Sequence, residues 1–241
     1  MQFVNHYYIT GTSKGIGKAL AELLLEKGET VTGISRSCSI EHHNYTHHSI
    51  DLSDLEAVKN FEFQEAVNAE KIALVNNAGT LGEVSYVGNS SDDDIINAFN
   101  INLTAVAVLT NKFIKAYITY TAEKIILNIT SGAAHHIYDG WSAYCTTKAG
   151  MDMFTRVIDK EQQLTKSNIK IMAVAPGIIE TQMQEQIRNA DESCFSAKHD
   201  FIEYHQQGML KPVSQSARQL FDVLKNPSKY PDAVFDLRDL A

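Results

Sequence analysis

The chain has 241 residues, 44% of them hydrophobic and 21% charged, which is the composition of a folded globular domain and excludes an intrinsically disordered chain. The net charge of −8 argues against a nucleic-acid partner, because phosphate backbones attract basic surfaces. We also expect no membrane partner and a cytoplasmic location. No apolar run approaches the ~18 residues of a membrane helix, the first residues do not resemble a signal peptide, and the three cysteines are too scattered for a disulfide framework.

Apolar, β-branched runs alternate with helical patterns along the chain. The runs predict strands at residues 3–10, 30–35, 45–50, 72–76, 125–130, 169–175 and 233–237. The helical patterns predict helices at residues 16–27, 92–120, 144–164 and 214–224, and a further helix after the third strand with Ser53 as its N-cap. The stretch 178–210 is polar and predicts only short helical pieces.

This alternation predicts the fold class and the place of the site. Strands that alternate with helices form parallel sheets with helices on both faces, so we expect an α/β protein with a doubly wound parallel sheet of about seven strands. No linker or repeat divides the chain, which predicts one domain over residues 1–241. Ligands of such sheets bind beyond the carboxyl ends of the strands.

A glycine-rich turn follows the first predicted strand. In the segment 10–17, Gly11 allows a tight turn, Gly15 lets a pyrophosphate approach the backbone, and Gly17 allows close packing of helix on strand. The next helix would offer free N–H groups and its positive dipole end to the phosphates. We therefore expect a dinucleotide at this turn, with Ser13 and Ile16 among its contacts.

The end of the second strand indicates which dinucleotide is bound. This position carries Ser35 and Arg36 and no carboxylate that could bind a ribose 2′-hydroxyl. Arg36 could pair with a 2′-phosphate, and Lys14 in the glycine turn adds a second cation, which predicts NADP(H). Asp51, with the Leu52 backbone beside it, could bind the adenine amino group, or Asp51 could simply be an acid at a helix start.

Tyr144 and Lys148 are four residues apart at the start of a predicted helix and therefore share one face. A nearby ammonium favours tyrosinate, so Lys148 is expected to lower the pKa of the Tyr144 phenol and to suit it for proton transfer. Ser131 follows the fifth strand, where its hydroxyl could hold a carbonyl oxygen.

Three further segments follow strands or interrupt a helix. Gly79, after the fourth strand, leaves room beside a cofactor, and the mid-helix Asn102 is unfavourable enough to suggest a role. Pro176 and Gly177 follow the sixth strand, and Thr181 could meet the nicotinamide amide.

Together these motifs resemble the short-chain dehydrogenase/reductase family along nearly the whole chain. They are TGTSKGIG (10–17), DL (51–52), NNAG (76–79), Asn102, Ser131, YCTTK (144–148) and PGIIET (176–181). The resemblance implies a Rossmann fold, with Tyr144 as proton donor or acceptor, Lys148 holding the ribose and Ser131 orienting the carbonyl. It implies that Asn102, rather than Asn100, positions a water in a proton relay. It also places Asn77 and Ala78 beside the adenosine ribose, and Ile178 beside the nicotinamide.

The segments 140–150, 175–177, 181–184 and 208–212 resemble a narrower branch, the sepiapterin and bacterial benzil reductases. That resemblance implies NADPH-dependent reduction of one carbonyl of a vicinal dicarbonyl, with the substrate loop at 178–210. The substrate contacts that it implies are His135, Trp141, Met183 and, as an anchor near the C-terminus, Asp239 or Asp236.

Several alternatives stay open on the sequence. The family also includes reductases of 3-oxoacyl thioesters and dehydrogenases of secondary alcohols, and a non-catalytic NADPH sensor would share the glycine turn. The resemblance implies a homodimer or homotetramer formed through the helices at 92–120 and 144–164. The histidines at 42, 43, 47 and 48 have no acid or cysteine at ligand spacing, so we expect no metal site.

Overall fold

A computed structural model describes residues 5–66 and 69–239. Its centre is one seven-stranded, entirely parallel sheet with the strand order β3-β2-β1-β4-β5-β6-β7. The strands are β1 (His6–Thr10), β2 (Thr30–Ser35), β3 (Tyr45–Ser49), β4 (Lys71–Asn76), β5 (Glu123–Ile129), β6 (Ile169–Ala175) and β7 (Val234–Asp236). The four central strands are almost continuously buried, because helices cover both faces of the sheet.

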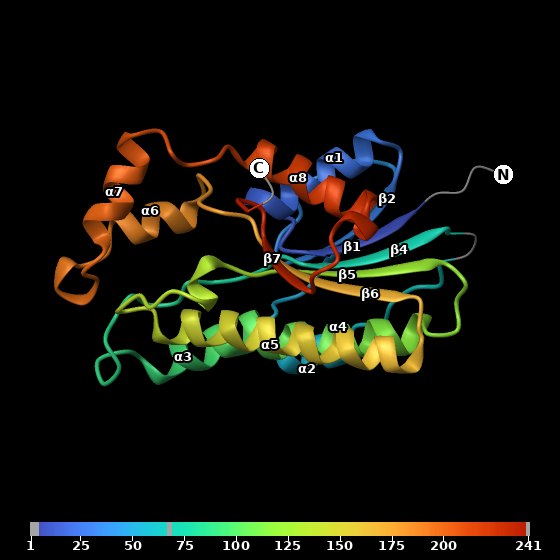
Figure 1. The fold of residues 1–241 in the computed structure, drawn as a ribbon, viewed down its shortest axis with the longest axis horizontal. Helices are drawn as coiled ribbons and strands as arrows, with labels where there is room; N and C mark the ends of the chain where they lie inside the picture. Colours follow the sequence, from blue (N-terminus) through green and yellow to red (C-terminus); the bar gives the residue numbers. More distant parts are fainter. Residues whose placement is uncertain (1–4, 67–68, 240–241) are drawn as a thin grey trace.

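Two helical layers enclose the sheet (Figure 1). On one face lie α1 (Gly15–Glu26) and α8 (Val213–Lys225), which pack against each other and bury Leu20, Leu24 and Leu220. The opposite face carries α2 (Leu55–Asn60), α3 (Asp92–Phe99), α4 (Ala105–Tyr117) and α5 (Ser142–Thr165). This arrangement confirms the predicted α/β class and doubly wound parallel sheet.

Short elements gather beyond the carboxyl ends of the strands. Figure 1 shows α6 (Gln182–Arg188) and α7 (Lys198–Gln206) at this end of the sheet, away from the two main layers. The 3₁₀ turn η2 (Gly132–Ala134) follows β5, η3 (Glu192–Cys194) lies between α6 and α7, and η4 (Pro227–Lys229) precedes β7. A third apolar cluster, centred on Trp141, Phe195 and Phe201, packs these pieces together. The short helical pieces expected at 178–210 are therefore present.

Three predicted elements differ in detail. The helix expected at 92–120 ends at Tyr117 and is interrupted by η1 (Asn100–Thr104), a π-helical turn. Asp54, not Ser53, caps α2, because its carboxylate accepts from the N–H groups of Glu56 and Ala57. The first strand begins at His6, and the first two residues predicted for it, Phe3 and Val4, lie outside the described residues.

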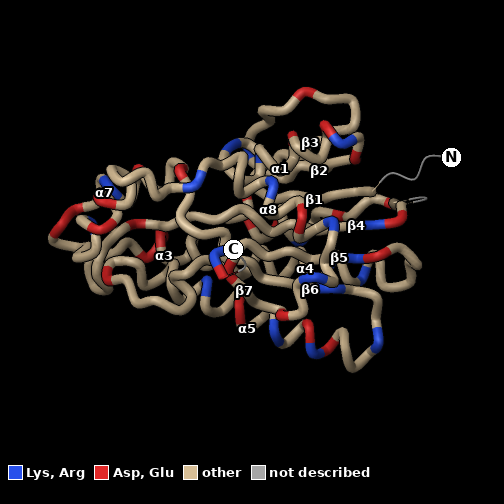
Figure 2. Tube along the Cα trace, turned by 45° about the horizontal axis from the view of Figure 1, so that its top comes forward, with Lys and Arg blue, Asp and Glu red and all other residues tan. Residues whose placement is uncertain are grey.

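Charges of both signs are interspersed along the chain (Figure 2). No helix among residues 5–66 and 69–239 is long and apolar enough to cross a membrane. Within the same residues, no cluster of histidine, cysteine and acidic side chains has the geometry of a metal site.

Candidate active site

The glycine turn joins β1 to α1 and has the geometry of a phosphate cradle. Gly11 and Gly15 have φ values of 76° and 61°, and no heavy atom lies within 4 Å of the position of a Cβ at Gly15. A Cβ at Gly17 would collide with the Asn77 side chain and the Gly11 carbonyl. No side chain caps the N-terminus of α1, so its N–H groups are free to bind an anion. These features fit the pyrophosphate of a dinucleotide.

Asn77 and Ala78 brace this turn from the end of β4. The Thr10 hydroxyl accepts from the N–H groups of both residues at 3.0 Å. The Asn77 amide in turn donates to the Thr10 carbonyl at 2.9 Å. The NNAG segment therefore holds the glycine turn close to the neighbouring strand.

Arg36, predicted to bind the 2′-phosphate, follows β2, and Asp51, predicted to bind the adenine, follows β3. Arg36 is exposed, and its Nη1 lies 4.0 Å from Asp51 Oδ2. Asp51 Oδ1 accepts from the Ser53 N–H and hydroxyl, and the backbone hydrogen bond lowers the pKa of the Asp51 carboxyl. The structure thus brings Arg36 and Asp51 together at one edge of the site, with the Leu52 side chain buried behind them.

Ser35 and Lys14 point elsewhere. The Ser35 side chain is buried and its hydroxyl donates to the Ser37 carbonyl at 3.0 Å. This hydroxyl therefore bonds to the backbone just after β2. Lys14 projects from the glycine turn across the site and donates to the Gln182 side chain at the start of α6. Ser13 accepts a hydrogen bond from the Ser39 hydroxyl through its carbonyl, and Ile16 packs against the core.

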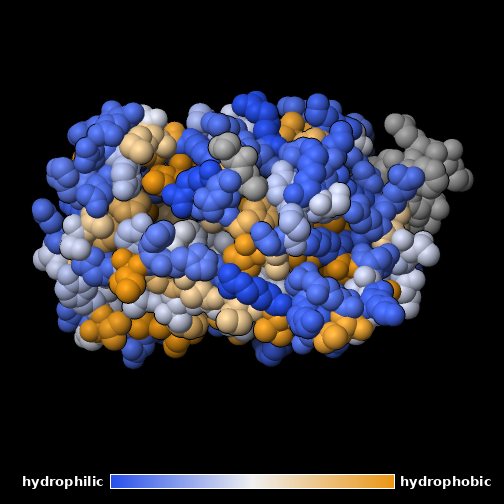
Figure 3. All heavy atoms as spheres, viewed as in Figure 1, coloured by the Kyte–Doolittle hydropathy of each residue, from blue (hydrophilic) through white to orange (hydrophobic). Residues whose placement is uncertain are grey.

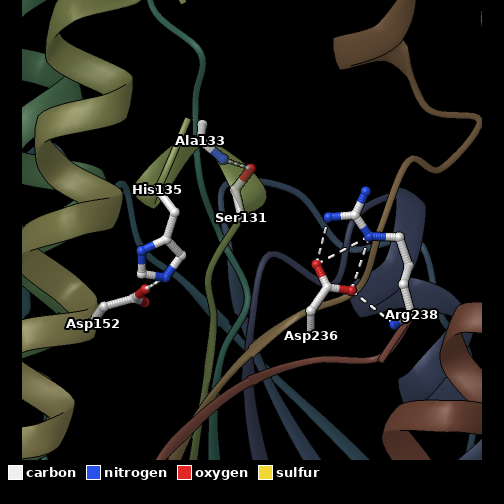
Figure 4. A network of polar contacts seen from close by, with 6 residues as sticks. All are labelled: Ser131, Ala133, His135, Asp152, Asp236 and Arg238. Carbon is white, nitrogen blue, oxygen red and sulfur yellow. Dashed lines mark hydrogen bonds and ion pairs between the residues drawn. The ribbon is translucent and has the colours of Figure 1, made fainter. Parts of the chain in front are cut away.

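Tyr144, Lys148 and Ser131 converge next to the carboxyl ends of β5 and β6. Tyr144 and Lys148 lie one helical turn apart at the start of α5 and are 7% and 3% exposed. The Lys148 ammonium donates to the Ile129 carbonyl at 2.8 Å and lies 5.7 Å from the centre of the Tyr144 ring. Ser131 follows β5 directly, and its Oγ accepts from the Ala133 N–H at 3.2 Å (Figure 4). The predicted catalytic side chains therefore share one site.

The pKa of Tyr144 differs in direction from the prediction made from residue spacing. Burial raises the pKa of its phenol, and a hydrogen bond with Ser131 acts in the opposite direction. The Lys148 ammonium lies 5.7 Å from the centre of the Tyr144 ring and donates to the Ile129 carbonyl. Burial lowers the pKa of Lys148 to about 8, against the opposing effect of the Asp152 carboxylate. The phenol is consequently protonated at neutral pH, the form that can donate a proton.

Asn102 occupies the π-helical turn and is fully buried. Its side chain binds the Thr80 backbone at both ends, accepting from the N–H and donating to the carbonyl at 2.8 Å each. A Cβ at Gly79 would lie 3.3 Å from Asn102 Oδ1 and 3.6 Å from Lys148 Nζ, so both side chains lie close to this glycine. Asn100 instead donates to the Ser53 carbonyl. Of the two asparagines, Asn102 is the one next to the lysine.

The segment after β6 forms the opposite side of the site. Gly177 has a φ of 88° and follows Pro176 at the strand end. The Ile178 carbonyl then accepts from the Lys211 N–H at 2.9 Å, which ties the segment to the chain after α7. Thr181 precedes α6, and its side chain makes no capping hydrogen bond.

The four residues expected at the substrate separate into two groups. Trp141 and Met183 belong to the apolar cluster beside Tyr144, where the Trp141 ring meets the Tyr144 ring edge-on at 5.9 Å. His135 instead turns its imidazole toward α5, with Nε2 3.0 Å from Asp152 Oδ2 (Figure 4). Asp239 is exposed after the last strand.

Sequence reasoning missed two charged residues near the site, Arg238 and Asp152. Arg238 forms a bidentate ion pair with Asp236 (Figure 4), and its guanidinium would lie 3.4 Å from a Cβ at Gly132. The pair with Asp236 has no sequence signal beyond closeness in the chain, and the approach to Gly132 has none. Asp152 had one, because it follows Lys148 by the same four residues that separate Lys148 from Tyr144.

Known proteins are similar in sequence to this chain along nearly its whole length. Benzil reductase ((S)-benzoin forming) from Bacillus subtilis is 36% identical over 97% of this chain and 98% of its own length. The protein of that name from Bacillus cereus is 36% identical over 93% and 96% of the two chains. Sepiapterin reductase from Meriones unguiculatus is 28% identical over 96% and 95%.

Solved structures show the same fold. A 4-hydroxyisoleucine dehydrogenase complexed with NADH superposes with a TM-score of 0.80 at 21% identity, covering 96% of each chain. The profile of the short chain dehydrogenases matches residues 5–192 of this chain. The chain therefore belongs to the short-chain dehydrogenase/reductase family, oxidoreductases that act on alcohol and carbonyl groups with a nicotinamide dinucleotide.

Proposed function

We propose that this protein is an NADPH-dependent carbonyl reductase that converts one carbonyl of a small vicinal dicarbonyl to the hydroxy ketone. The observation that carries the proposal is the buried Tyr144 phenol, with Ser131 and Lys148 beside it, at the edge of an aromatic cluster. The near-full-length similarity to two proteins named benzil reductase supports this choice of substrate.

The reaction assigns one task to each side chain. The substrate carbonyl oxygen accepts hydrogen bonds from the hydroxyls of Ser131 and Tyr144, which polarises the carbonyl and fixes its position. The dinucleotide, when bound, supplies the hydride that adds to the carbonyl carbon. Tyr144 gives its phenolic proton to the developing alkoxide, and the new C–H and O–H bonds complete the alcohol. Lys148 stabilises the tyrosinate that is left, which then takes a proton from solvent.

Apolar surface beside the tyrosine favours an aryl or similarly hydrophobic substrate. Trp141 stacks on Phe195 at 4.9 Å, and Met183 packs against the same cluster. Such rings offer a diketone flat apolar contacts at little cost in side-chain entropy.

The preference for NADPH rests on Arg36. Its guanidinium is 76% exposed at the end of β2, and no carboxylate stands at that strand end to bind a ribose hydroxyl pair. Lys14 lies in the neighbouring turn and would exchange its bond to Gln182 for the phosphate.

We also propose that the protein is a cytoplasmic homo-oligomer that associates through α5. Met153, Val157 and Leu164 project from this helix with exposures of 59%, 47% and 69%. Apolar side chains gather along the lower edge of the molecule in Figure 3, over the helices beneath the sheet. The three cysteines are free thiols, as expected in a reducing compartment.

The direct test measures NADPH and NADH oxidation with an aryl diketone, a pterin diketone and a 3-oxoacyl thioester. The reverse reaction is measured with secondary alcohols and NADP⁺. We expect the fastest turnover with NADPH and the diketone. Faster turnover of the thioester or of the alcohol would replace the proposed substrate, and tight NADPH binding without any turnover would identify a sensor.

A further inference from the structure

Asp152 is a buried carboxylate for which the reaction above has no use. It is 1% exposed and lies one helical turn after Lys148 on α5, so Tyr144, Lys148 and Asp152 form a row on one face of the helix. Burying a carboxylate costs free energy unless it is paired. Neither Asp152 oxygen has a hydrogen-bond partner among residues 5–66 and 69–239. The position therefore calls for charged or polar neighbours, and the chain supplies two.

The first partner is His135, which follows η2. Its Nε2 lies 3.0 Å from Asp152 Oδ2, and its side chain is 57% exposed. The imidazole also borders a surface pocket of about 590 Å³ between the segments 85–87 and 133–140. His135 therefore connects the buried carboxylate to solvent, and Figure 4 shows its imidazole directed at Asp152.

The second partner is Lys148 itself. The Asp152 carboxylate opposes the effect of burial on the pKa of the Lys148 ammonium, and burial raises the pKa of Asp152. The remaining groups that face Asp152 are the Thr130 hydroxyl at the end of β5 and Arg156, one turn further along α5, and both lower its pKa. The carboxylate thus lies between the reaction's lysine and a surface histidine.

We propose that Asp152, held by His135, is a positioning residue that keeps Lys148 in its ammonium form for the proposed reduction. The Nε2 of His135, 3.0 Å from Oδ2, keeps the carboxylate ionised, and the carboxylate in turn keeps the proton on the lysine amine. No proton passes between Lys148, Asp152 and His135, and the lysine keeps its proton. The inference depends on the proposed function only for its effect on turnover.

The test follows the protonation of Lys148 directly and turnover separately. In ¹³C-lysine-labelled protein, the Lys148 resonance is the one that Lys148→Arg removes, and its titration midpoint is measured by NMR. Asp152→Asn should move this midpoint to lower pH by about one unit. His135→Leu should move it in the same direction, whereas His135→Gln keeps an N–H donor and should restore the midpoint.

Two variants serve as controls, the half-buried Asp159→Asn further along α5 and His136→Leu next to His135; both should leave the midpoint unchanged. The alkaline limb of kcat with NADPH and a diketone should move together with the midpoint. An unmoved midpoint in folded Asp152→Asn and His135→Leu would overturn the inference. A moved midpoint in a protein without turnover would support the charge pair and refute the reductase.

Discussion

Single side chains decide which dinucleotide is bound and how the proton moves. Arg36 is the simplest case, since its charge is exposed and lies 4.0 Å from the Asp51 carboxylate. A charge-assisted hydrogen bond contributes about 1.5–3 kcal/mol, so Arg36→Asp should weaken NADPH binding by about tenfold to a hundredfold. The new carboxylate can bind ribose hydroxyls and should improve NADH binding.

The measurement is the Kd of each dinucleotide by fluorescence titration, with Lys27→Asp as the control. Lys27 is an exposed cation at the far end of α1, and its replacement changes the net charge equally. Equal loss of NADPH affinity in both variants would show that only the overall charge matters.

Burial of the Lys148 ammonium, which the proposed reaction uses, is expected to lower the stability of the folded protein. Its pKa falls from 10.5 to about 8 on folding, so the folded protein holds fewer protons than the unfolded chain between these pH values. The cost of burying the charge, about 3 kcal/mol, is fully present below pH 8 and fades as the pH rises toward 10.5.

Lys148→Met should therefore raise the free energy of unfolding at pH 7. The gain should be roughly 1–3 kcal/mol, smaller than the full cost of burial, because the variant also loses the bond to the Ile129 carbonyl. The gain should shrink above pH 8, and turnover should be lost. Urea unfolding at pH 7 and pH 10 measures this, with the exposed Lys160→Met as control. A gain that grows with pH would contradict the account.

At the scale of elements, the π-helical turn between α3 and α4 brings an asparagine to the site. A regular helix pattern gives no sign of such a turn, so the sequence predicted one uninterrupted helix over 92–120. The asparagine itself could be singled out, because a buried mid-helix amide is unfavourable without partners. What could not be predicted was its partner, Thr80, which comes from a loop after β4.

Asn102→Ala would leave both backbone groups of Thr80 without their partner. We expect a loss of about 1–3 kcal/mol in the free energy of unfolding and a lower kcat, because the loop beside Lys148 loses its anchor. Thermal unfolding and kcat are measured beside Asn100→Ala, which removes one hydrogen bond from the same turn. Equal effects in the two variants would refute a special role for Asn102.

For the whole molecule, the parallel sheet of about seven strands and the helices on both of its faces could be predicted from periodicity and connection rules. The phosphate turn was equally predictable, because Gly11 and Gly15 need backbone conformations that few other residues adopt. Side-chain direction and burial were not. His135 turns toward a carboxylate 17 residues further along the chain, and burial raises the pKa of Tyr144.

The oligomeric state of variants tests the interface proposed on α5. Val157→Glu places a charge in the exposed apolar face of α5 and should shift the protein to monomers in light scattering after gel filtration. Met209→Glu, an exposed apolar residue outside this helix, should leave the mass unchanged. Unchanged mass in both variants would place the interface elsewhere.

The central claim is that the Tyr144 phenol gives the proton in carbonyl reduction. The most direct measurement compares Tyr144→Phe with the natural protein for NADPH affinity and for turnover of an aryl diketone. Loss of the hydroxyl should reduce kcat by at least about a hundredfold while the Kd for NADPH stays within about threefold. Turnover that persists in the phenylalanine variant would contradict the account.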